Sequence, residues 1–500
     1  MFIQGVYDIY NSMKKLLIAF FSLPLIGLSA VAQQKTEDIY DPSAQYEYPA
    51  ESLVREKLDQ WQDQKFGIFL HWGLYSVEGI PESWTICGEP WPKRDSTLSY
   101  EDYKKWYWGL SKKINPVKFN PDRWAVISKN AGAKYVVFTT KHHDGFSMFD
   151  TRQSDYKITN GPFRNNPQAD VTKYIFDAYR KEGMMVGAYF SKPDWHSQDF
   201  WWDRFPTPTR NINYDLKKYP EKWKRFKDFT FNQISELMGN YGKIDILWLD
   251  GGWIRPALKS ELERKEWGLN ERGRANYPNF NQEVDMPRIA KMARGKQPGI
   301  LVVDRTVHGP YENYRTPEQS VPKEQIKEPW ETCITLTKSW SYRKPAEEKV
   351  KSSAWVIHTL TEIVAKGGNM LLGFGPTPEG EFPKEVEKPL EEVGAWLQKN
   401  GEAIYATRIV DNYNDELTWF TGSKDGKTRY AIACIKDGEI IPVTLKWKGN
   451  QPAKGSKIRL ISSGKNVDWK MEGEAVVVTL PKDLAGKKTQ AIAFAFVPAK

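Results

Sequence analysis

Short apolar runs recur along the first four fifths of the chain, with stretches of helical periodicity between them. Strands that alternate with helices in this way are typical of a parallel α/β architecture. A helix-compatible stretch at residues 384–399 ends this part of the chain. The expected strands are residues 66–71, 135–141, 185–191, 244–250, 300–305, 333–340 and 369–375.

Polar clusters follow several of these runs, reading LHWG, KHHDG, YFSKPDW, LWLDGGW and VVDR. Chemistry at the carboxyl ends of parallel strands is typical of a (β/α)8 barrel. A doubly wound sheet is the alternative, but no glycine-rich phosphate turn follows the first strand. We therefore predict a catalytic (β/α)8-like barrel over residues 51–404.

The pattern changes at residue 405, where short alternating segments are separated by turn clusters such as Lys-Asp-Gly and Lys-Gly-Asn. This pattern predicts an antiparallel β-sandwich over residues 405–500. Its expected strands are residues 430–435, 441–447, 458–461, 475–480 and 491–497.

The amino-terminal region carries an apolar run at residues 16–31, preceded by two lysines and followed by Ala32 in a small-residue site. This pattern predicts a cleaved signal peptide over residues 1–32, with Met13 as the start of translation. Residues 33–50 form a polar linker, and we expect no membrane span after cleavage. Three cysteines are too few for a disulfide framework. The expected location is secreted or periplasmic.

The composition excludes a disordered chain, a coiled coil and a collagen-like repeat, since 40% of residues are hydrophobic and 27% charged. The 21 Trp, 24 Tyr and 23 Phe provide flat faces that suit sugars or bases, although an aromatic core is the alternative explanation. The net charge of +9 fits either an anionic partner or a solvated surface. No basic run is long enough for a nucleic-acid arm, so we predict no nucleic-acid partner.

Asp250 ends a predicted strand before Gly251 and Gly252. With a side-chain period of two, it shares a face with Trp248, Ile246 and Ile244. If that face looks into the barrel, the carboxylate lies at the mouth beside an indole and is placed to attack a sugar. The alternative is an aspartate that merely caps a turn.

Histidine is scarce, with six in the chain, yet His71, His142 and His143 each follow a predicted strand. Two adjacent imidazoles beside Asp144 suggest a metal, but strand neighbours point to opposite faces and no third ligand lies at an obvious spacing. We therefore predict no metal and no cofactor, and imidazoles that bind sugar hydroxyls.

A glycosidase also needs a second carboxyl group on the other side of the scissile bond. The loop after the fifth strand offers Glu312 and Glu318. Sequence spacing does not choose between them, and each has the alternative of a solvated loop glutamate.

Seven ordered segments resemble glycoside hydrolase family 29, the retaining α-L-fucosidases. They read KFGIFLHWGLYSV, YVVFTTKHHDGFSMFDT, GAYFSKPDW, ILWLDGGW, DRTVHGPYENYRTPEQ, GGNMLLGFGPTPEG and WLQKNGEAIYATR. The resemblance extends from about residue 55 to the carboxyl terminus. It implies a barrel followed by a sandwich, and an oligosaccharide or polysaccharide substrate.

The resemblance also implies roles for individual residues. Asp250 would be the nucleophile that forms a covalent glycosyl-enzyme. Glu318, aligned through Thr316-Pro317-Glu318, is the preferred acid/base, and Glu312 is the second choice. The implied substrate-binding residues are His71, His142 and His143 on sugar hydroxyls, Tyr189, Trp248 on the ring, Arg305, and Trp340 on the methyl side.

The chain departs from the family at Lys105-Trp106-Tyr107, where many members have Glu-Trp-Tyr, and at Phe190, which replaces a tyrosine. Lys105 and Trp106 are thus candidate substrate-binding residues with altered recognition. The departure leaves an exo-α-L-galactosidase acting on a galactan, with sulfate favoured by the basic charge, as an alternative to the fucosidase. A non-catalytic carbohydrate-binding protein is the alternative from another class.

Overall fold

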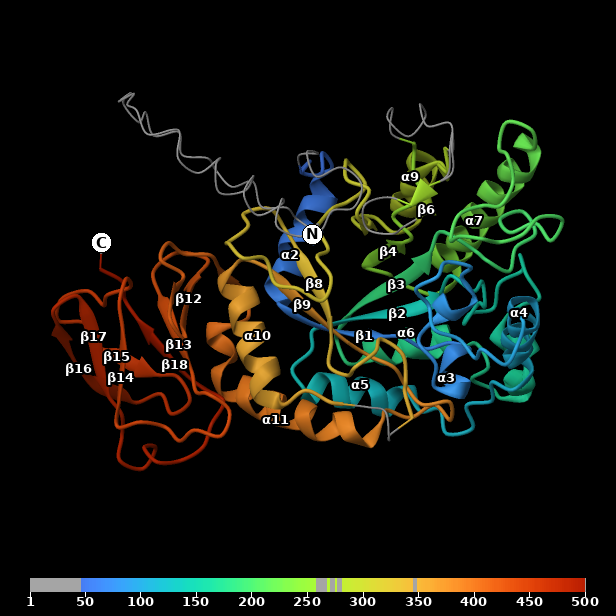
Figure 1. Ribbon diagram of the computed structural model, residues 1–500. Helices are drawn as coiled ribbons and strands as arrows, with labels where there is room; N and C mark the ends of the chain where they lie inside the picture. The colour runs from blue at the N-terminus through green and yellow to red at the C-terminus, as the bar shows by residue number, and fades with distance from the viewer. Residues whose placement is uncertain (1–45, 258–267, 270–274, 277–280, 345–348, 500) are drawn as a thin grey trace, which may run out of the picture. The chain divides into compact units, whose positions relative to one another are not determined.

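The computed structural model describes residues 46–257, 268–269, 275–276, 281–344 and 349–499. The proposed signal peptide and most of the linker lie outside these residues. Within them, no helix is both long and apolar enough to cross a bilayer. Two large sheets dominate the structure, a parallel one and an antiparallel one (Figure 1).

The first sheet is a curled, all-parallel sheet of seven strands in the order β7-β4-β3-β2-β1-β9-β8. The prediction of a parallel barrel-type architecture is confirmed. Its strands are β1 (Phe66–Leu70), β2 (Tyr135–Lys141), β3 (Met185–Ser191), β4 (Ile246–Asp250), β7 (Leu301–Asp304), β8 (Glu331–Thr335) and β9 (Asn369–Phe374).

Helices connect these strands and cover the outside of the curl (Figure 1). Their starts follow ordinary capping rules. Asn120 accepts a hydrogen bond from the Arg123 amide before Pro121, and Ser352 accepts one from the Trp355 amide. The helices are α2 (Ser52–Gln64), α3 (Tyr75–Glu78), α4 (Tyr100–Trp108), α5 (Pro121–Asn130), α6 (Val171–Lys181), α7 (Pro220–Asn240), α9 (Met286–Lys296), α10 (Ser353–Ala365) and α11 (Lys384–Asn400).

An irregular segment, residues 311–319, closes the gap between β7 and β8. It first runs antiparallel to β7, where the Asn313 amide donates to the Val302 carbonyl at 2.9 Å. It then turns and runs parallel to β8, where the Gln319 amide donates to the Cys333 carbonyl at 2.9 Å. This V-shaped closing segment therefore takes the place of an eighth strand.

The strand side chains separate into an inner and an outer set. Ile246 and Trp248 pack inside the curl with Phe69 and Tyr189. Leu247, between the first two, packs in the outer core instead. The period of two is therefore as predicted from Ile246 onward, and Asp250 continues its inner face. Ile244, expected on the same face, precedes β4 and packs in the outer core instead.

The second sheet has nine strands, and its antiparallel pairing and separate apolar core confirm a sandwich-type fold. Trp447 is its largest buried residue and packs against Phe494 and Phe496. The strands are β10 (Thr407–Arg408), β11 (Asn414–Asp415), β12 (Thr418–Ser423), β13 (Arg429–Cys434), β14 (Thr444–Trp447), β15 (Ile458–Leu460), β16 (Asn466–Glu472), β17 (Ala475–Thr479) and β18 (Ala491–Phe496).

Direct contacts join the second sheet to helices of the first. Trp396 on α11 donates from Nε1 to the Ala491 carbonyl at 2.8 Å, and Nε2 of His358 on α10 lies 2.8 Å from the Gln490 carbonyl oxygen. The two sheets belong to one compact unit. A domain boundary at residues 404–405 stays a prediction. A small pair, β5 (Gly268–Leu269) and β6 (Ala275–Asn276), completes the strands.

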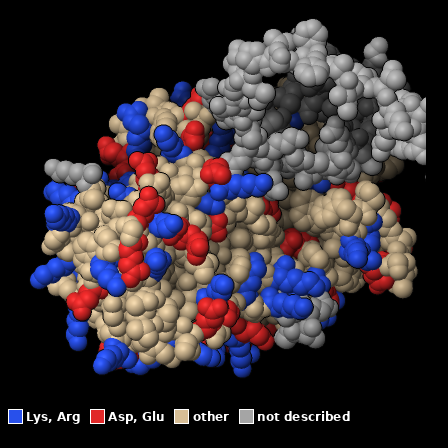
Figure 2. All heavy atoms as spheres, turned by 60° about the vertical axis from the view of Figure 1, so that its left-hand side comes forward, with Lys and Arg blue, Asp and Glu red and all other residues tan. Residues whose placement is uncertain are grey.

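On the face seen in Figure 2, Lys and Arg side chains lie interspersed with Asp and Glu side chains. This mixed pattern is that of a solvated surface. The net charge of +9 is therefore not concentrated into a single-sign field on this face.

Candidate functional site

Asp250 ends β4 at the carboxyl edge of the parallel sheet, and its side chain is 15% exposed. Its Oδ2 accepts a hydrogen bond from the Tyr189 hydroxyl at 2.7 Å, and its Oδ1 accepts one from Arg305 at 3.2 Å. The chain turns immediately afterwards at Gly251, whose φ is 89° and whose Cβ would lie 2.4 Å from Pro193 Cδ. The turn leaves the carboxylate projecting at the strand end.

The electrostatic surroundings keep Asp250 ionised. Burial by itself raises the pKa of this carboxyl group, but Arg305, His143 and the Tyr189 hydroxyl lower it. The lowering effects are larger, so the pKa of Asp250 lies well below its ordinary value. An ionised, partly accessible carboxylate is what a nucleophile at a sugar carbon requires.

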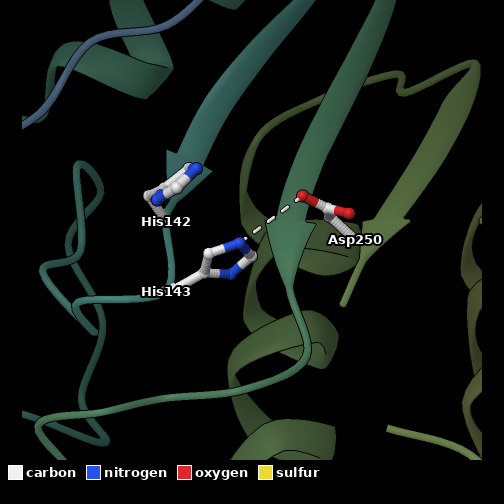
Figure 3. Close-up of side chains that lie close together, drawn as sticks. All are labelled: His142, His143 and Asp250. Atoms are coloured by element: carbon white, nitrogen blue, oxygen red, sulfur yellow. Dashed lines mark ion pairs between the residues drawn. The ribbon is translucent and has the colours of Figure 1, made fainter. Parts of the chain in front are cut away.

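His142 and His143 follow β2 and lie beside Asp250 (Figure 3). A serine contacts Nδ1 of each ring: Ser83 at 2.5 Å from His142, and Ser191 at 2.8 Å from His143. His143 Nε2 is 3.7 Å from Asp250 Oδ2. Burial lowers the pKa of His142 to about 4 and that of His143 well below its ordinary value. Both rings are therefore neutral at pH 7 and can donate or accept a hydrogen bond through Nε2.

The same three side chains are the described group most suited to a metal, since their ligand atoms lie within 4.8 Å of one another. That spread is wide for a zinc ion, whose bonds to nitrogen and oxygen are about 2.0–2.2 Å. The guanidinium of Arg305, 3.2 Å from Asp250, would also repel a cation. This arrangement suits sugar hydroxyls better, and the absence of a metal stays a prediction.

Aromatic rings form the inner wall of the site. Tyr189 stacks on Trp248 with ring centroids 5.4 Å apart, and Phe69 lies edge-on to Trp248 at 5.2 Å. His71 stacks on Trp340 at 5.0 Å. Burial lowers the pKa of His71 well below its ordinary value, so this ring is neutral as well. The wall is mostly aromatic with few polar groups, among them the Tyr189 hydroxyl that donates to Asp250, as in most small-molecule sites.

Glu318 lies in the part of the closing segment that runs parallel to β8. Arg305 contacts both Glu318 and Asp250. Its Oε2 accepts a hydrogen bond from the second Arg305 nitrogen, and its Oε1 accepts one from Trp340 Nε1 at 3.2 Å. The side chain is 40% exposed. Arg305 thus connects two carboxylates, one on β4 and one on the closing segment.

Glu312 lies in the part of the closing segment that runs antiparallel to β7, and it has a different environment. Its side chain is 2% exposed, and its oxygens contact the Thr306 amide at 2.9 Å, His308 Nδ1 at 2.8 Å and Arg315 at 2.7 Å. These contacts hold the loop together. The structure therefore separates two glutamates that the sequence could not distinguish.

Lys105 and Trp106 are not among the residues that meet around Asp250. Lys105 is 78% exposed and pairs with Asp102 at 3.6 Å, while Trp106 packs against Tyr103 at 5.1 Å. The reason is the helical period of α4, which buries Tyr103 and Tyr107 on one face and turns Lys105 outward. That these two residues bind substrate stays a prediction.

The structure adds residues that the sequence analysis missed. Phe69 and Ser191 share a strand face with His71 and Tyr189, two residues away, so the period of two could have indicated them. Ser83 lies in η1 (Ser83–Ile86), far from any strand end, and no sequence pattern indicated it.

A buried ion pair behind the site was also missed. Lys192 Nζ pairs with Asp304, the residue before Arg305, and donates to the Ile254 carbonyl at 2.8 Å. Both charged side chains are at most 3% exposed. The pair connects the carboxyl ends of β3 and β7 and so helps to position Arg305.

The comparisons with known proteins agree in the family that they indicate. The family model described as "Alpha-L-fucosidase" matches residues 32–402. Plasma alpha-L-fucosidase of Rattus norvegicus is 28% identical over 92% of this chain and 94% of its own, and tissue alpha-L-fucosidase of Bos taurus is 29% identical over 86% of each chain. Alpha-L-fucosidase isoenzyme 1 of Paenibacillus thiaminolyticus has a TM-score of 0.68 at 28% identity, covering 90% of this chain and 100% of its own.

Proposed function

This chain belongs to the alpha-L-fucosidase family of glycoside hydrolases, and from that premise we propose that it is a retaining exo-α-L-fucosidase that removes terminal α-L-fucosyl units from glycans. The observation that carries the proposal is the single guanidinium of Arg305 held between Asp250 and Glu318. Two carboxyl groups that share one site are the requirement of glycoside hydrolysis.

In the first step, the Asp250 carboxylate attacks the anomeric carbon. A bond forms between its oxygen and that carbon while the glycosidic bond breaks. Glu318, in its protonated form, gives its proton to the leaving oxygen. The second step reverses the roles: Glu318 removes a proton from water, the water oxygen bonds to the carbon, and Asp250 leaves. The configuration is retained because the carbon is inverted twice.

Arg305 fits this sequence because the negative charge moves between its two partners. Before attack the charge is on Asp250, and in the glycosyl-enzyme it is on Glu318, since Asp250 has become an ester. A guanidinium that contacts both can stabilise each state without moving far. This explains why one arginine between two carboxyl groups is useful here.

The reacting sugar is bound by the neutral rings of His71, His142 and His143 through its hydroxyls. Trp340 and Phe69 supply an apolar wall that suits the methyl group of L-fucose. The relatives reported above are all fucosidases, so the exo-α-L-galactosidase alternative is not favoured. The two carboxyl groups on Arg305 also favour an enzyme over a non-catalytic carbohydrate-binding protein.

The test uses the Asp250→Gly variant with an aryl α-L-fucoside. We expect turnover to fall by at least about a thousandfold, and added azide to restore it with an inverted glycosyl azide as product. A variant that keeps most of its activity would overturn the nucleophile assignment. Comparing the aryl α-L-fucoside with the matching α-L-galactoside on the wild type tests the sugar preference directly.

The location and the full glycan are finer proposals. We propose that the mature protein acts outside the cytoplasm, which the predicted signal peptide and the plasma fucosidases among the relatives support. An anionic glycan stays a prediction that rests on the net charge of +9 alone.

A further inference from the structure

Trp91 is the most exposed tryptophan among the described large apolar residues, with half of its surface accessible. It lies in the loop after η1, and its ring centroid is 5.1 Å from that of Trp84. Trp84 in turn lies 4.9 Å from the catalytic-site ring of His143. Two indoles thus connect the proposed fucose site to the solvent.

Trp91 is held in place by a hydrogen bond to a buried ion pair. Its Nε1 donates to Glu89 Oε2 at 2.7 Å, and Glu89 is 1% exposed. The same carboxylate accepts two hydrogen bonds from the Arg210 side chain, at 2.7 and 2.5 Å. The Arg210 guanidinium lies 4.8 Å from the Trp84 ring centroid and so fixes the second indole.

The loop between the two tryptophans is also fixed at its base. Arg94 donates from Nε to the Thr85 carbonyl at 3.0 Å and from its terminal nitrogen to the Cys87 carbonyl at 2.6 Å. These contacts join the start of the loop to its end. The orientation of Trp91 is therefore set before any ligand arrives.

This arrangement is costly for stability alone. It buries an ion pair, which often gives no net stabilisation, and it uses that pair to hold an exposed ring. A rigid, exposed indole beside a polar site is instead well suited to a ligand, because little conformational entropy is lost on contact.

We infer that Trp91 and Trp84 form a second sugar-binding subsite, which takes the apolar face of the neutral sugar unit adjoining the reacting L-fucosyl unit. The inference rests on the proposed function. It adds that the enzyme recognises a glycan of at least two sugar units. The buried Glu89–Arg210 pair already satisfies charge at this place, so the bound unit carries none.

The test compares two substrates. In α-L-fucosyl fluoride the leaving group is a fluoride ion, which is too small to reach Trp91, whereas fucosyl-lactose trisaccharides with α1,2 or α1,3 linkage can contact it. For Trp91→Ala we expect kcat/KM on a trisaccharide to fall at least tenfold, mainly through KM, and kcat/KM on the fluoride to stay within twofold. Trp91→Phe should restore most of the loss.

The matched control is Trp419→Ala, which removes a partly buried tryptophan from β12 in the antiparallel sheet. This control variant should change kcat/KM on neither the trisaccharide nor the fluoride. A second readout needs no turnover. Tryptophan fluorescence measures the binding of a trisaccharide to the Asp250→Gly variant, with and without the additional Trp91→Ala change.

Each outcome decides between the two proposals. Equal losses on both substrates, or no loss on either, would overturn the subsite while leaving the fucosidase intact. A wild type that hydrolyses the fluoride but no trisaccharide would also overturn it. A wild type that hydrolyses neither substrate would instead refute the proposed function.

Discussion

Arg305 contacts Asp250 at 3.2 Å through one guanidinium nitrogen and leaves the other nitrogen for Glu318. This fork geometry is available to arginine and not to lysine. The pKa of Asp250 is lowered despite its burial, with Arg305 as the largest lowering influence. Removing the guanidinium should therefore change both the rate and its pH dependence.

For Arg305→Met we expect kcat/KM on an aryl α-L-fucoside to fall by about 100- to 1,000-fold. Because the pKa of Asp250 rises when its positive neighbour is lost, the acid limb of the pH profile should move to higher pH. Arg305→Lys keeps the positive charge but not the two-pronged geometry. Its acid limb should therefore move part of the way back toward that of the wild type, while kcat/KM stays low. An unchanged acid limb in the Met variant would contradict this account.

The two glutamates of the closing segment should respond in opposite ways to the same substitution. Glu318→Gln removes the proposed proton donor, so kcat on a substrate with a poor leaving group should fall by about 100- to 10,000-fold, and less on α-L-fucosyl fluoride. Glu312→Gln should leave kcat within a few fold. It should lower the free energy of unfolding by about 3 kcal/mol, because it breaks a buried charge network. Kinetics and thermal melts of both variants check this, and reversed results would exchange the roles.

Glu331 should make stability depend on pH. It is fully buried beneath Trp248, which donates to it at 3.2 Å, and Tyr135 donates to it at 2.6 Å. Burial raises its pKa from 4.5 to about 7. The folded chain holds this proton more tightly than the unfolded chain, so the contribution is favourable below pH 4.5 and is lost as the pH rises to about 7.

Glu331→Gln should therefore make the melting temperature depend less on pH between these two values. At pH 8 it should stabilise the protein by up to about 3 kcal/mol, the equivalent of the raised pKa. Melting curves of wild type and variant at pH 4.5, 6 and 8 measure the difference. Parallel pH profiles in the two proteins would show that Glu331 is not the group responsible.

Lys105→Ala tests the position of α4. The side chain is exposed, and its pairing with Asp102 is a solvent-screened surface contact. We expect KM and kcat for an aryl α-L-fucoside to stay within twofold. His142→Ala, which removes a ring at the site, is the matched comparison and should raise KM at least tenfold. A large effect of Lys105→Ala would instead support the sequence-based prediction that Lys105 binds substrate.

The strands of the parallel sheet could be predicted because their apolar runs are short and lie between helical stretches. Asp250 could be placed at the mouth of the barrel because a period of two leaves it on the face of Trp248. These inferences depend only on local pattern, and the structure agrees with them.

The rest depended on how distant segments meet. Glu312 and Glu318 lie in one loop, and only the V-shaped path beside β7 and β8 separates their environments. Trp340 was expected within a strand, but β8 ends at Thr335 and the indole reaches the site from the following loop. Lys105 was chosen because Lys105-Trp106-Tyr107 aligns with the Glu-Trp-Tyr of many family members. That alignment does not tell which face of the helix is buried.

The V-shaped segment also makes the two halves of the reaction independent as engineering targets. Asp250, the proposed nucleophile, ends a regular strand whose register is set by β3 and β7 on either side. The proposed proton donor, Glu318, lies on the closing segment, which pairs with β7 and β8 only through isolated bridges. Substitutions in this segment that leave Arg305 in place can therefore move the proposed donor while β4 keeps Asp250 fixed, which makes the segment the natural place to convert a hydrolase into an enzyme that builds glycosidic bonds.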